Sequence, residues 1–203
     1  MPAYERVLIA VDPVIFTITH DHLQVLLRQR EKEPFKGKYE LPGGLVQHGE
    51  TAELALSRKL TEILGTQNVF FTQFHTFTAP QRDPRARTAS IGFIALVSRD
   101  KIPAGEEWLS VDQLPLLAFD HKDIITKARA YLRQHLDAEL LRQFLPEKFP
   151  LNNLQLVHEI IMQEKYDNRN FRKKMVAAGI VEETGESEQN VSHRPAKLYR
   201  FKS

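Results

Sequence analysis

Short apolar runs separated by polar turns fill the first half of the chain, a pattern typical of β-strands. Val7–Ile18 is rich in valine, isoleucine and phenylalanine, and Leu23–Leu27 follows it after a polar turn, so the two runs predict a hairpin. Tyr39–Leu41 predicts a short strand that ends at the bend Pro42–Gly44, because glycine adopts backbone conformations closed to other residues. Two further strands are predicted over Val69–Phe77 and Ala89–Val97.

Two segments of the first 137 residues instead space their apolar positions as a helix does. Thr51–Leu64 carries leucine and isoleucine at near-helical spacing, and Thr51 is suited to cap its start as Gly65 is to end it. His121–Leu136 predicts a second amphipathic helix. This part of the chain is therefore expected to combine strands with two helices.

The chain changes character near Pro146 and Pro150, after which helices are predicted. The first begins at a capping asparagine, Asn152 or Asn153, and runs to about Gln163. Its apolar residues recur at helical spacing, so one face is expected to be buried.

A second helix is predicted over Asn168–Ala178, with Asp167 as its cap. Two short strands, Ile180–Glu183 and Lys197–Phe201, then enclose the polar loop Thr184–Arg194. Helix, turn, helix and two-stranded ribbon in this order predict a winged helix-turn-helix. The residues expected to face inward on its second helix are Phe171, Met175 and Val176.

Composition narrows the class of protein. Among 203 residues, 42% are apolar and 27% charged, an ordinary globular balance that excludes a wholly disordered or collagen-like chain. No apolar run approaches the roughly 20 residues that a membrane span needs, and the start of the chain does not resemble a secretory signal. Cysteine is absent, which excludes disulfides and thiol chemistry. A cytoplasmic protein without a membrane partner is expected.

Charge adds a candidate binding surface. The formal net charge is only +2, but the stretch Asn168–Lys174 (NRNFRKK) concentrates basic residues and contains no acid. Such a patch favours a polyanionic partner, and the alternative is a solvated charged face.

A spaced motif covers residues 44–66. Gly44 is followed after five residues by Glu50 and after seven more by Arg58, with Leu60 and Gly65 also in register. Together with the preceding Leu-Pro-Gly-Gly, this stretch resembles the Nudix box. The resemblance implies an α+β protein whose first domain, residues 1–137, is a Nudix α/β/α sandwich with a mixed sheet, followed by a linker (138–150) and a winged helix-turn-helix domain (151–203).

The motif departs from the Nudix pattern where the family places its metal-binding glutamates. Positions 59, 62 and 63 are Lys59, Glu62 and Ile63, so one carboxylate of three remains on a helix face where three would converge on magnesium. Glu62 is in reach of Lys59 or Arg58 as an ordinary ion pair. We therefore expect no metal site, no required cofactor and no ordinary hydrolase activity, with Glu50, Arg58 and Glu62 as remnants of the box. The alternative is a displaced metal site with Glu50 and Glu62 as ligands.

The resemblance to the Nudix box implies a pocket that can bind a nucleotide even without catalysis. Gly43 and Gly44 permit close backbone approach, and Arg82 and Arg85 offer planar forks for phosphate or carboxylate. The loop that holds them is similar to one in Nudix regulators, although Asp83 pairing with a neighbouring arginine on a surface turn is the alternative. His121 is a candidate for the pocket wall or for the helix start. The predicted ligand-binding set is Gly43, Gly44, Arg82, Asp83, Arg85 and His121.

The C-terminal stretch resembles the end of the Nudix-related transcriptional regulators of NAD cofactor metabolism. That resemblance spans nearly the whole chain and implies a repressor that binds palindromic double-stranded DNA as a homodimer and is released by ADP-ribose. The predicted DNA-binding residues lie on the second helix and at the wing. They are Asn168, Arg169, Asn170, Arg172, Lys173, Lys174, His193, Arg194 and Lys197.

Three alternatives stay open on the sequence. The chain could be a Nudix hydrolase of a nucleoside diphosphate derivative with a C-terminal docking domain, or its last segment could be a small protein-interaction domain. A sister branch of the regulators with the same architecture responds to sugars, and nothing in the predicted binding loops decides against it.

Overall fold

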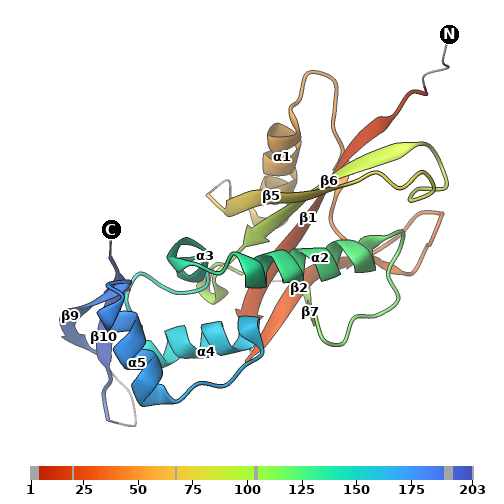
Figure 1. The fold of residues 1–203 in the computed structure, drawn as a ribbon. Helices are drawn as coiled ribbons and strands as arrows, with labels where there is room; N and C mark the ends of the chain where they lie inside the picture. The colour runs from red at the N-terminus through yellow and green to blue at the C-terminus, as the bar shows by residue number, and fades with distance from the viewer. Residues whose placement is uncertain (1–4, 20, 67, 103–104, 190–193, 203) are drawn as a thin grey trace.

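A long strand, β1 (Leu8–Thr19), runs through the middle of a mixed β-sheet (Figure 1). The computed structural model describes residues 5–19, 21–66, 68–102, 105–189 and 194–202. In this part of the chain the sheet has seven strands, in the order β3-β2-β1-β6-β5, with β4 beside β1 and β7 beside β2. β1 pairs in parallel with β6 and antiparallel with β2 and β4. The other strands are β2 (His22–Gln29), β3 (Tyr39–Glu40), β4 (Gly44–Leu45), β5 (Phe70–Phe77), β6 (Thr88–Leu96) and β7 (Glu107–Ser110), with a 3-10 turn, η1, at Arg99–Lys101.

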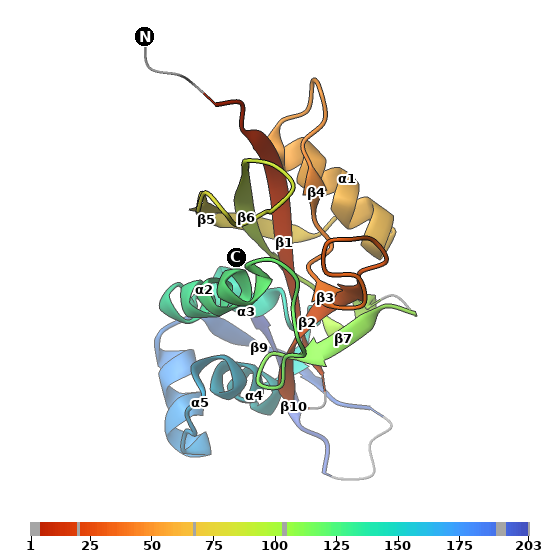
Figure 2. The ribbon, with the colours of Figure 1, turned by 90° about the vertical axis from the view of Figure 1, so that its right-hand side faces the viewer.

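A helix covers each face of this sheet. Val11 of β1 packs in the apolar cluster of α1 (Ala52–Leu64), whereas Val14 packs in the cluster of α2 (His121–Gln134). Because successive side chains of a strand point to opposite faces, positions three apart place α1 and α2 on opposite sides of β1 (Figure 2). The predicted hairpin and the predicted α/β/α sandwich are confirmed.

Local signals set the ends of α1. The Thr51 side chain accepts a hydrogen bond from the backbone N–H of Leu54 at 3.2 Å, and Gly65 ends the helix in the left-handed region at φ 68°. Both features match the sequence prediction. Leu54 itself is exposed, so the apolar face of α1 is narrower than its leucine content indicates.

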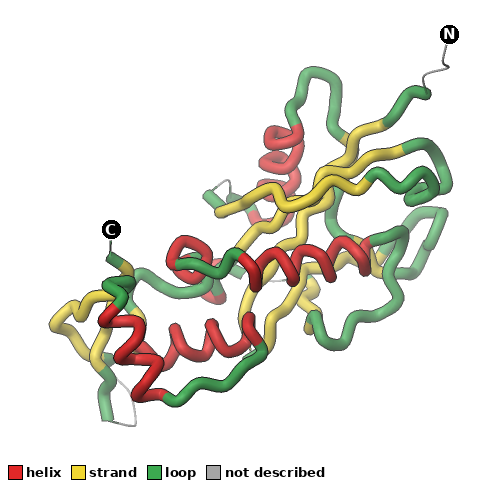
Figure 3. Tube along the Cα trace, viewed as in Figure 1, coloured by secondary structure: helices red, strands yellow, loops and turns green. Residues whose placement is uncertain are grey.

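The segment predicted as a linker is folded. It contains the short helix α3 (Ala138–Arg142) and the strand β8 (Phe149–Pro150), with Leu140, Leu141 and Phe144 buried (Figure 3). Asp137 caps α3 by accepting from the N–H of Leu140 at 2.9 Å. Since its apolar side chains enter the core, this segment holds the two parts of the chain together rather than separating them.

The last part of the chain has the predicted order of helix, helix and ribbon. It consists of α4 (Leu151–Met162), α5 (Asn168–Ala177), β9 (Val181–Ser187) and β10 (Lys197–Phe201). β8 pairs with β10, so the sheet is three-stranded, in the order β8-β10-β9, where a two-stranded ribbon was expected.

Two sequence predictions for these helices were wrong in detail. α4 begins directly after Pro150, and neither Asn152 nor Asn153 caps it, because the fixed φ of proline already suits a helix entrance. Val176 is 48% exposed, since the buried face of α5 follows the i, i+4 pair Phe171 and Met175 and the next residue turns away from it.

One apolar cluster runs through both parts of the molecule. It joins Val14 of the sheet and Leu132 of α2 to Leu154 of α4 and Phe171 of α5. Among the residues described, no helix combines the length and apolar character that crossing a bilayer requires.

Candidate ligand pocket and nucleic-acid interface

A cavity of about 530 Å³ opens beside the first half of β1, between β4, the loop before β6 and the start of α2. Five lysine and arginine side chains and three carboxylates line it, so its lining has a net positive charge. The structure brings together there all six residues of the predicted ligand-binding set, namely Gly43, Gly44, Arg82, Asp83, Arg85 and His121.

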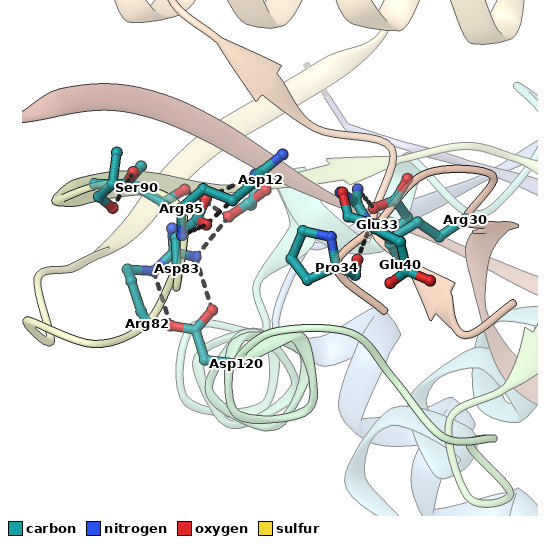
Figure 4. A network of polar contacts seen from close by, with 12 residues as sticks. Asp12, Arg30, Glu33, Pro34, Glu40, Arg82, Asp83, Arg85, Ser90 and Asp120 are labelled. Atoms are coloured by element: carbon teal, nitrogen blue, oxygen red, sulfur yellow. Dashed lines mark hydrogen bonds and ion pairs between the residues drawn. The ribbon is translucent and has the colours of Figure 1, made fainter. Parts of the chain in front are cut away.

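Arg82 is enclosed and donates hydrogen bonds to two carboxylates (Figure 4). Its side chain is 5% exposed and donates to Asp120 through Nε (2.9 Å) and Nη2 (2.7 Å), and to Asp12 through Nη2 (3.0 Å). Burial acts to lower the pKa of Arg82, but the bonds to Asp120 and the charge of Asp12 outweigh it, so the pKa is raised. The Ser90 hydroxyl donates to the same Asp12 carboxylate at 2.6 Å. This guanidinium therefore ties the loop before β6 to β1 and to the start of α2, and Ser90 joins β6 to the same carboxylate.

His121 is the first residue of α2 and also lines the cavity, so its position agrees with both interpretations of the sequence. Its Nδ1 accepts a hydrogen bond from the backbone N–H of Leu41 at 2.9 Å, and its Nε2 lies 3.8 Å from an Asp12 oxygen. Burial, opposed by the charge of Asp12, lowers the pKa of His121. A neutral ring is expected at pH 7, with its proton on Nε2.

Asp83 and Arg85 form a pair within one turn. The Asp83 carboxylate accepts from Arg85 Nε (2.9 Å), Nη2 (2.7 Å) and backbone N–H (3.0 Å). The bond to Arg85 lowers the pKa of Asp83. The pairing is the one that the sequence left as an alternative, yet both residues line the cavity, and the Arg85 side chain is 53% exposed. Arg85 is thus an accessible arginine of the cavity, while Arg82 is enclosed.

Gly43 and Gly44 leave room that a side chain would fill. A Cβ at Gly43 would overlap Oδ1 of Asp12, and one at Gly44 would lie 2.7 Å from Cε of Lys59. The backbone can therefore approach the acidic network on one side and the Lys59 stem on the other.

The charged residues of the box are paired with one another. Arg58 donates to both oxygens of Glu50, at 2.7 and 2.9 Å, and its Nη1 lies 3.5 Å from Glu62. Lys59 Nζ lies 2.8 Å from the other Glu62 oxygen. The bonds from Arg58 and from the Gln47 N–H hold the pKa of Glu50 at about 2, and Lys59 lowers the pKa of Glu62. The ion pair that the sequence predicted for Glu62 is confirmed.

The residues present do not fit a magnesium ion at the box. Lys59 lines the cavity with an ammonium where the family has a carboxylate, and Ile63 is buried in the apolar cluster beneath α1. Within the described ranges, no group of three or more His, Asp or Glu side chains is arranged to hold a metal.

The sequence missed part of the cavity lining. Phe119 and Arg30 both line it, one from the turn before α2 and the other from the end of β2. Phe119 lies two residues before His121, which the sequence analysis weighed as a pocket residue, and this closeness in sequence is the signal that could have found it.

The helix α5 presents a second candidate surface. Its cap is Asp167, whose side chain accepts from the N–H of Asn170 at 2.9 Å as predicted, and the buried Phe171 and Met175 fix which face is outward. Among the residues described, no ion pair involves the basic side chains of this helix. The structure places every predicted residue of this helix in solvent, namely Asn168, Arg169, Asn170, Arg172, Lys173 and Lys174.

The wing lies on the same side as this helix. Lys197 is exposed and pairs with Glu183 at 2.7 Å, which raises its pKa, whereas the charge of Arg172 lowers it. The helix α5 also packs against β9 of the wing. Arg194 is exposed, and His193 lies outside the described residues.

Comparisons with known proteins match this architecture. Residues 10–128 match the NUDIX domain family, and residues 141–201 match the NrtR DNA-binding winged helix domain. An ADPR responsive transcriptional repressor, NtrR, from Acinetobacter baylyi is 35% identical over 98% of this chain and 83% of its own. An ADP-ribose pyrophosphatase from Methanocaldococcus jannaschii is 38% identical over 58% of this chain and 70% of its own.

Solved structures give the same picture. Shewanella oneidensis NrtR in complex with a 27mer DNA superimposes with a TM-score of 0.82, at 31% identity, over 96% of this chain and 93% of that one. The NUDIX domain of the same protein complexed with ADP ribose superimposes with a TM-score of 0.55, at 34% identity, over 64% and 90%. The fold and the two surfaces thus define a Nudix domain joined to a winged helix domain. With matches of this extent to both parts, the chain belongs to the NrtR family.

Proposed function

We propose that this protein is a transcriptional repressor that binds DNA through its winged helix and is released from it by ADP-ribose. The observation that carries the proposal is one chain with two surfaces. These are a basic face on α5 that forms no ion pair with the described residues, and a net positive cavity in the Nudix domain. The A. baylyi repressor and the DNA complex of S. oneidensis NrtR support both halves, because each matches nearly the whole chain.

DNA recognition is assigned to the exposed face of α5. Arg172 and Arg169 are suited to guanine edges and Asn168 to adenine, while Lys174 is suited to phosphate. Arg194 and Lys197 of the wing are suited to the DNA backbone or the minor groove. No cofactor is required by this scheme.

ADP-ribose is assigned to the Nudix cavity. Its diphosphate matches the net positive lining, and Gly43 and Gly44 allow close approach of the backbone. The ADP ribose complex of the S. oneidensis NUDIX domain supports this assignment over the sugar-responsive alternative.

The protein is further proposed to act as a homodimer on palindromic sites that control NAD metabolism genes. Two recognition helices would then read half-sites about one DNA turn, ~34 Å, or a multiple of it apart. If ADP-ribose favours an arrangement in which that spacing is lost, DNA affinity falls by linkage. One protomer per DNA at saturation would contradict the dimer.

Fluorescence anisotropy tests the repressor proposal. Labelled DNA from the gene's own promoter and from NAD biosynthesis promoters is titrated at moderate salt, with and without ADP-ribose. Tight binding that ADP-ribose relieves is the expected result. Tight binding indifferent to ADP-ribose would contradict the effector and keep the DNA reader, and an absence of binding to every fragment would favour the hydrolase alternative.

We also propose that the protein does not hydrolyse ADP-ribose at an ordinary enzymatic rate. Glu50 and Glu62 are held by Arg58 and Lys59, and the third position is the buried Ile63, so the carboxylates needed to assemble a metal site are missing. The M. jannaschii pyrophosphatase is the observation that favours the rival, since it resembles the Nudix part alone.

Incubation with ADP-ribose and magnesium, followed by separation of AMP from substrate, tests this point. Turnover near 1 per second, ordinary for an enzyme, would overturn it. The Lys59→Glu variant is the matched comparison, because it returns a carboxylate to the cavity without burying a charge.

A further inference from the structure

Phe119 is the aromatic ring that the cavity offers to a ligand. Among the described residues that line the cavity, it is the one partly exposed aromatic side chain, because the other ring, His121, is buried and bonded. Its φ is +52°, a conformation that a bulky side chain seldom adopts. Outliers of this kind concentrate at ligand sites, where the surrounding structure holds them in place.

The Phe119 ring contacts a fixed guanidinium and a second aromatic ring. The centre of the Arg30 guanidinium lies 4.9 Å from the ring centroid, and Phe35 meets the ring edge-on with centroids 5.0 Å apart. Arg30 itself is fixed, since its side chain is only 10% exposed and donates to Glu40 at 2.6 Å and to the carbonyl of Pro34 at 2.5 Å. Figure 4 shows Arg30 with Pro34 and Glu40, in the same view as the Arg82 network. Phe119 therefore has a rigid support.

A second guanidinium, that of Arg85, also lies over the ring. Its centre is 5.2 Å from the Phe119 centroid. In contrast to Arg30, the Arg85 side chain is 53% exposed, and its hydrogen bonds to the described residues all go to Asp83, two residues away on the same turn. A long exposed side chain tied only to its own turn can swing aside at small cost.

We propose that Phe119 is the platform on which the base of the nucleotide effector stacks, and that Arg85 is a movable cover that the base displaces from the ring. The inference rests on the proposed function, because it assigns one part of the same ligand. A flat heterocycle gains stacking on Phe119 while the Arg30 guanidinium stays close to the ring. A sugar without a base gains no such stacking. Phe119 is thereby the residue that distinguishes a nucleotide from a sugar phosphate.

Calorimetric titration with ADP-ribose tests the platform. The Phe119→Leu variant keeps an apolar side chain but loses the ring, and it is expected to bind ADP-ribose about tenfold more weakly. The conservative Phe119→Tyr variant keeps the ring and is expected to retain the affinity within about threefold. Thermal unfolding of each variant establishes that the fold is kept.

Fluorescence supplies a readout that a merely structural role would not move. Trp108 is the single tryptophan of the chain and does not line the cavity, so its emission in the unaltered protein is the baseline. In the Phe119→Trp variant, AMP and ADP-ribose should quench the introduced indole by stacking. Ribose 5-phosphate, the half of ADP-ribose without a base, should not.

Four outcomes are decisive. Affinity of Phe119→Leu within twofold of the unaltered protein overturns the platform, as does an indole signal that saturating ADP-ribose leaves unchanged or that ribose 5-phosphate quenches equally. An unaltered protein that does not bind ADP-ribose overturns the effector assignment instead, so the two failures are distinguishable.

Discussion

Arg82 was predicted as a ligand-binding residue, and in the structure its hydrogen bonds go to two carboxylates of the protein. The sequence suggests that the Arg82 guanidinium binds phosphate. A single arginine between two polar neighbours does not reveal partners that are distant in the chain. In the structure its donors are directed at Asp12 and Asp120, which lie 70 and 38 residues away in the chain. These contacts become visible only once β1 and α2 are placed in space, so the pairing was beyond sequence reasoning.

Removal of the Arg82 side chain is expected to destabilise the protein strongly. Arg82→Ala leaves the buried Asp12 carboxylate and the partly buried Asp120 carboxylate without their cation, and breaking a buried pair in this way costs about 3–5 kcal/mol. Urea unfolding measures the loss. Arg85→Ala is the matched control and should cost less than about 1 kcal/mol, because its pair is half exposed. Equal effects of the two substitutions would contradict the structural role of Arg82.

The Glu50–Arg58 pair predicts a pH dependence. The pKa of Glu50 is about 2 when folded, below its ordinary value of 4.5, so its charged form is stabilised by folding. That contribution is complete above about pH 5 and is lost as the pH falls through 4.5 towards 2. Glu50→Gln should therefore be less stable than the parent at pH 7, and the gap in unfolding free energy should close in acid. A gap that stays constant from pH 7 to pH 3 would refute the pairing.

Much of the candidate site was predictable from residues whose meaning is local. The glycines of the bend and the Glu62 ion pair follow from spacing of a few residues, and the structure has both. Phe119 was missed because its role depends on Arg30 and Phe35, which approach it from another part of the chain.

At the scale of elements, α5 is a short helix that depends on its N-terminal cap and on its contacts with the core. The Asp167 side chain accepts from the N–H of Asn170 in its first turn, and two buried residues, Phe171 and Met175, attach the helix to the core. A ten-residue helix is marginal by itself, so the cap and these contacts decide whether the basic face is ordered.

Loss of the α5 cap should weaken the helix measurably. Asp167→Ala removes the acceptor for the Asn170 N–H, and such changes cost about 1 kcal/mol. Denaturant unfolding measures the stability, and amide exchange at the start of α5 locates the effect. Asp167→Asn, which keeps a capping oxygen, should recover most of the loss, and failure to do so would argue against the cap.

Arg172 should contribute to DNA binding from the middle of the exposed face. Arg172→Ala is expected to weaken operator binding by about 1–3 kcal/mol if the side chain reads a base, with relaxed specificity at one position. Anisotropy titrations over a range of salt test this. If Arg172 contacts a phosphate instead of a base, its removal should lower the salt dependence of binding. Unchanged affinity would remove Arg172 from the interface.

Elements with strong periodic patterns and local caps were predicted well, and short elements were not. α1 and the β1–β2 hairpin carry their own signals. β8 has only two residues, and it is a strand because Pro150 and Phe149 lie opposite Leu198 and Tyr199. Such a pairing depends on tertiary contact, which is why residues 138–150 were interpreted as a linker.

At the scale of the molecule, the two domains share one core. Arg133 near the end of α2 donates to the carbonyl of Ile161 in α4 at 2.8 Å, and α2 packs directly against α4. α2 begins at the Arg82 network beside the cavity and ends at the winged helix. The helix α2 therefore connects the cavity to the winged helix through continuous packing.

The shared core predicts a single unfolding transition. Since one apolar cluster contains residues of both parts, neither should melt alone. Scanning calorimetry should give one peak, with a calorimetric enthalpy equal to the van't Hoff value. Two separable peaks would show that the parts fold independently.

The strand β8 also limits how this molecule can be taken apart. Phe149 is completely buried and its strand belongs to the wing sheet, although it lies in the connection from the Nudix domain. A reader module cut at residue 151 would lack one strand of its own sheet. Any hybrid that transplants this winged helix onto another sensor must carry residues 138–150 with it, so the functional cassette is larger than the boundary drawn from sequence.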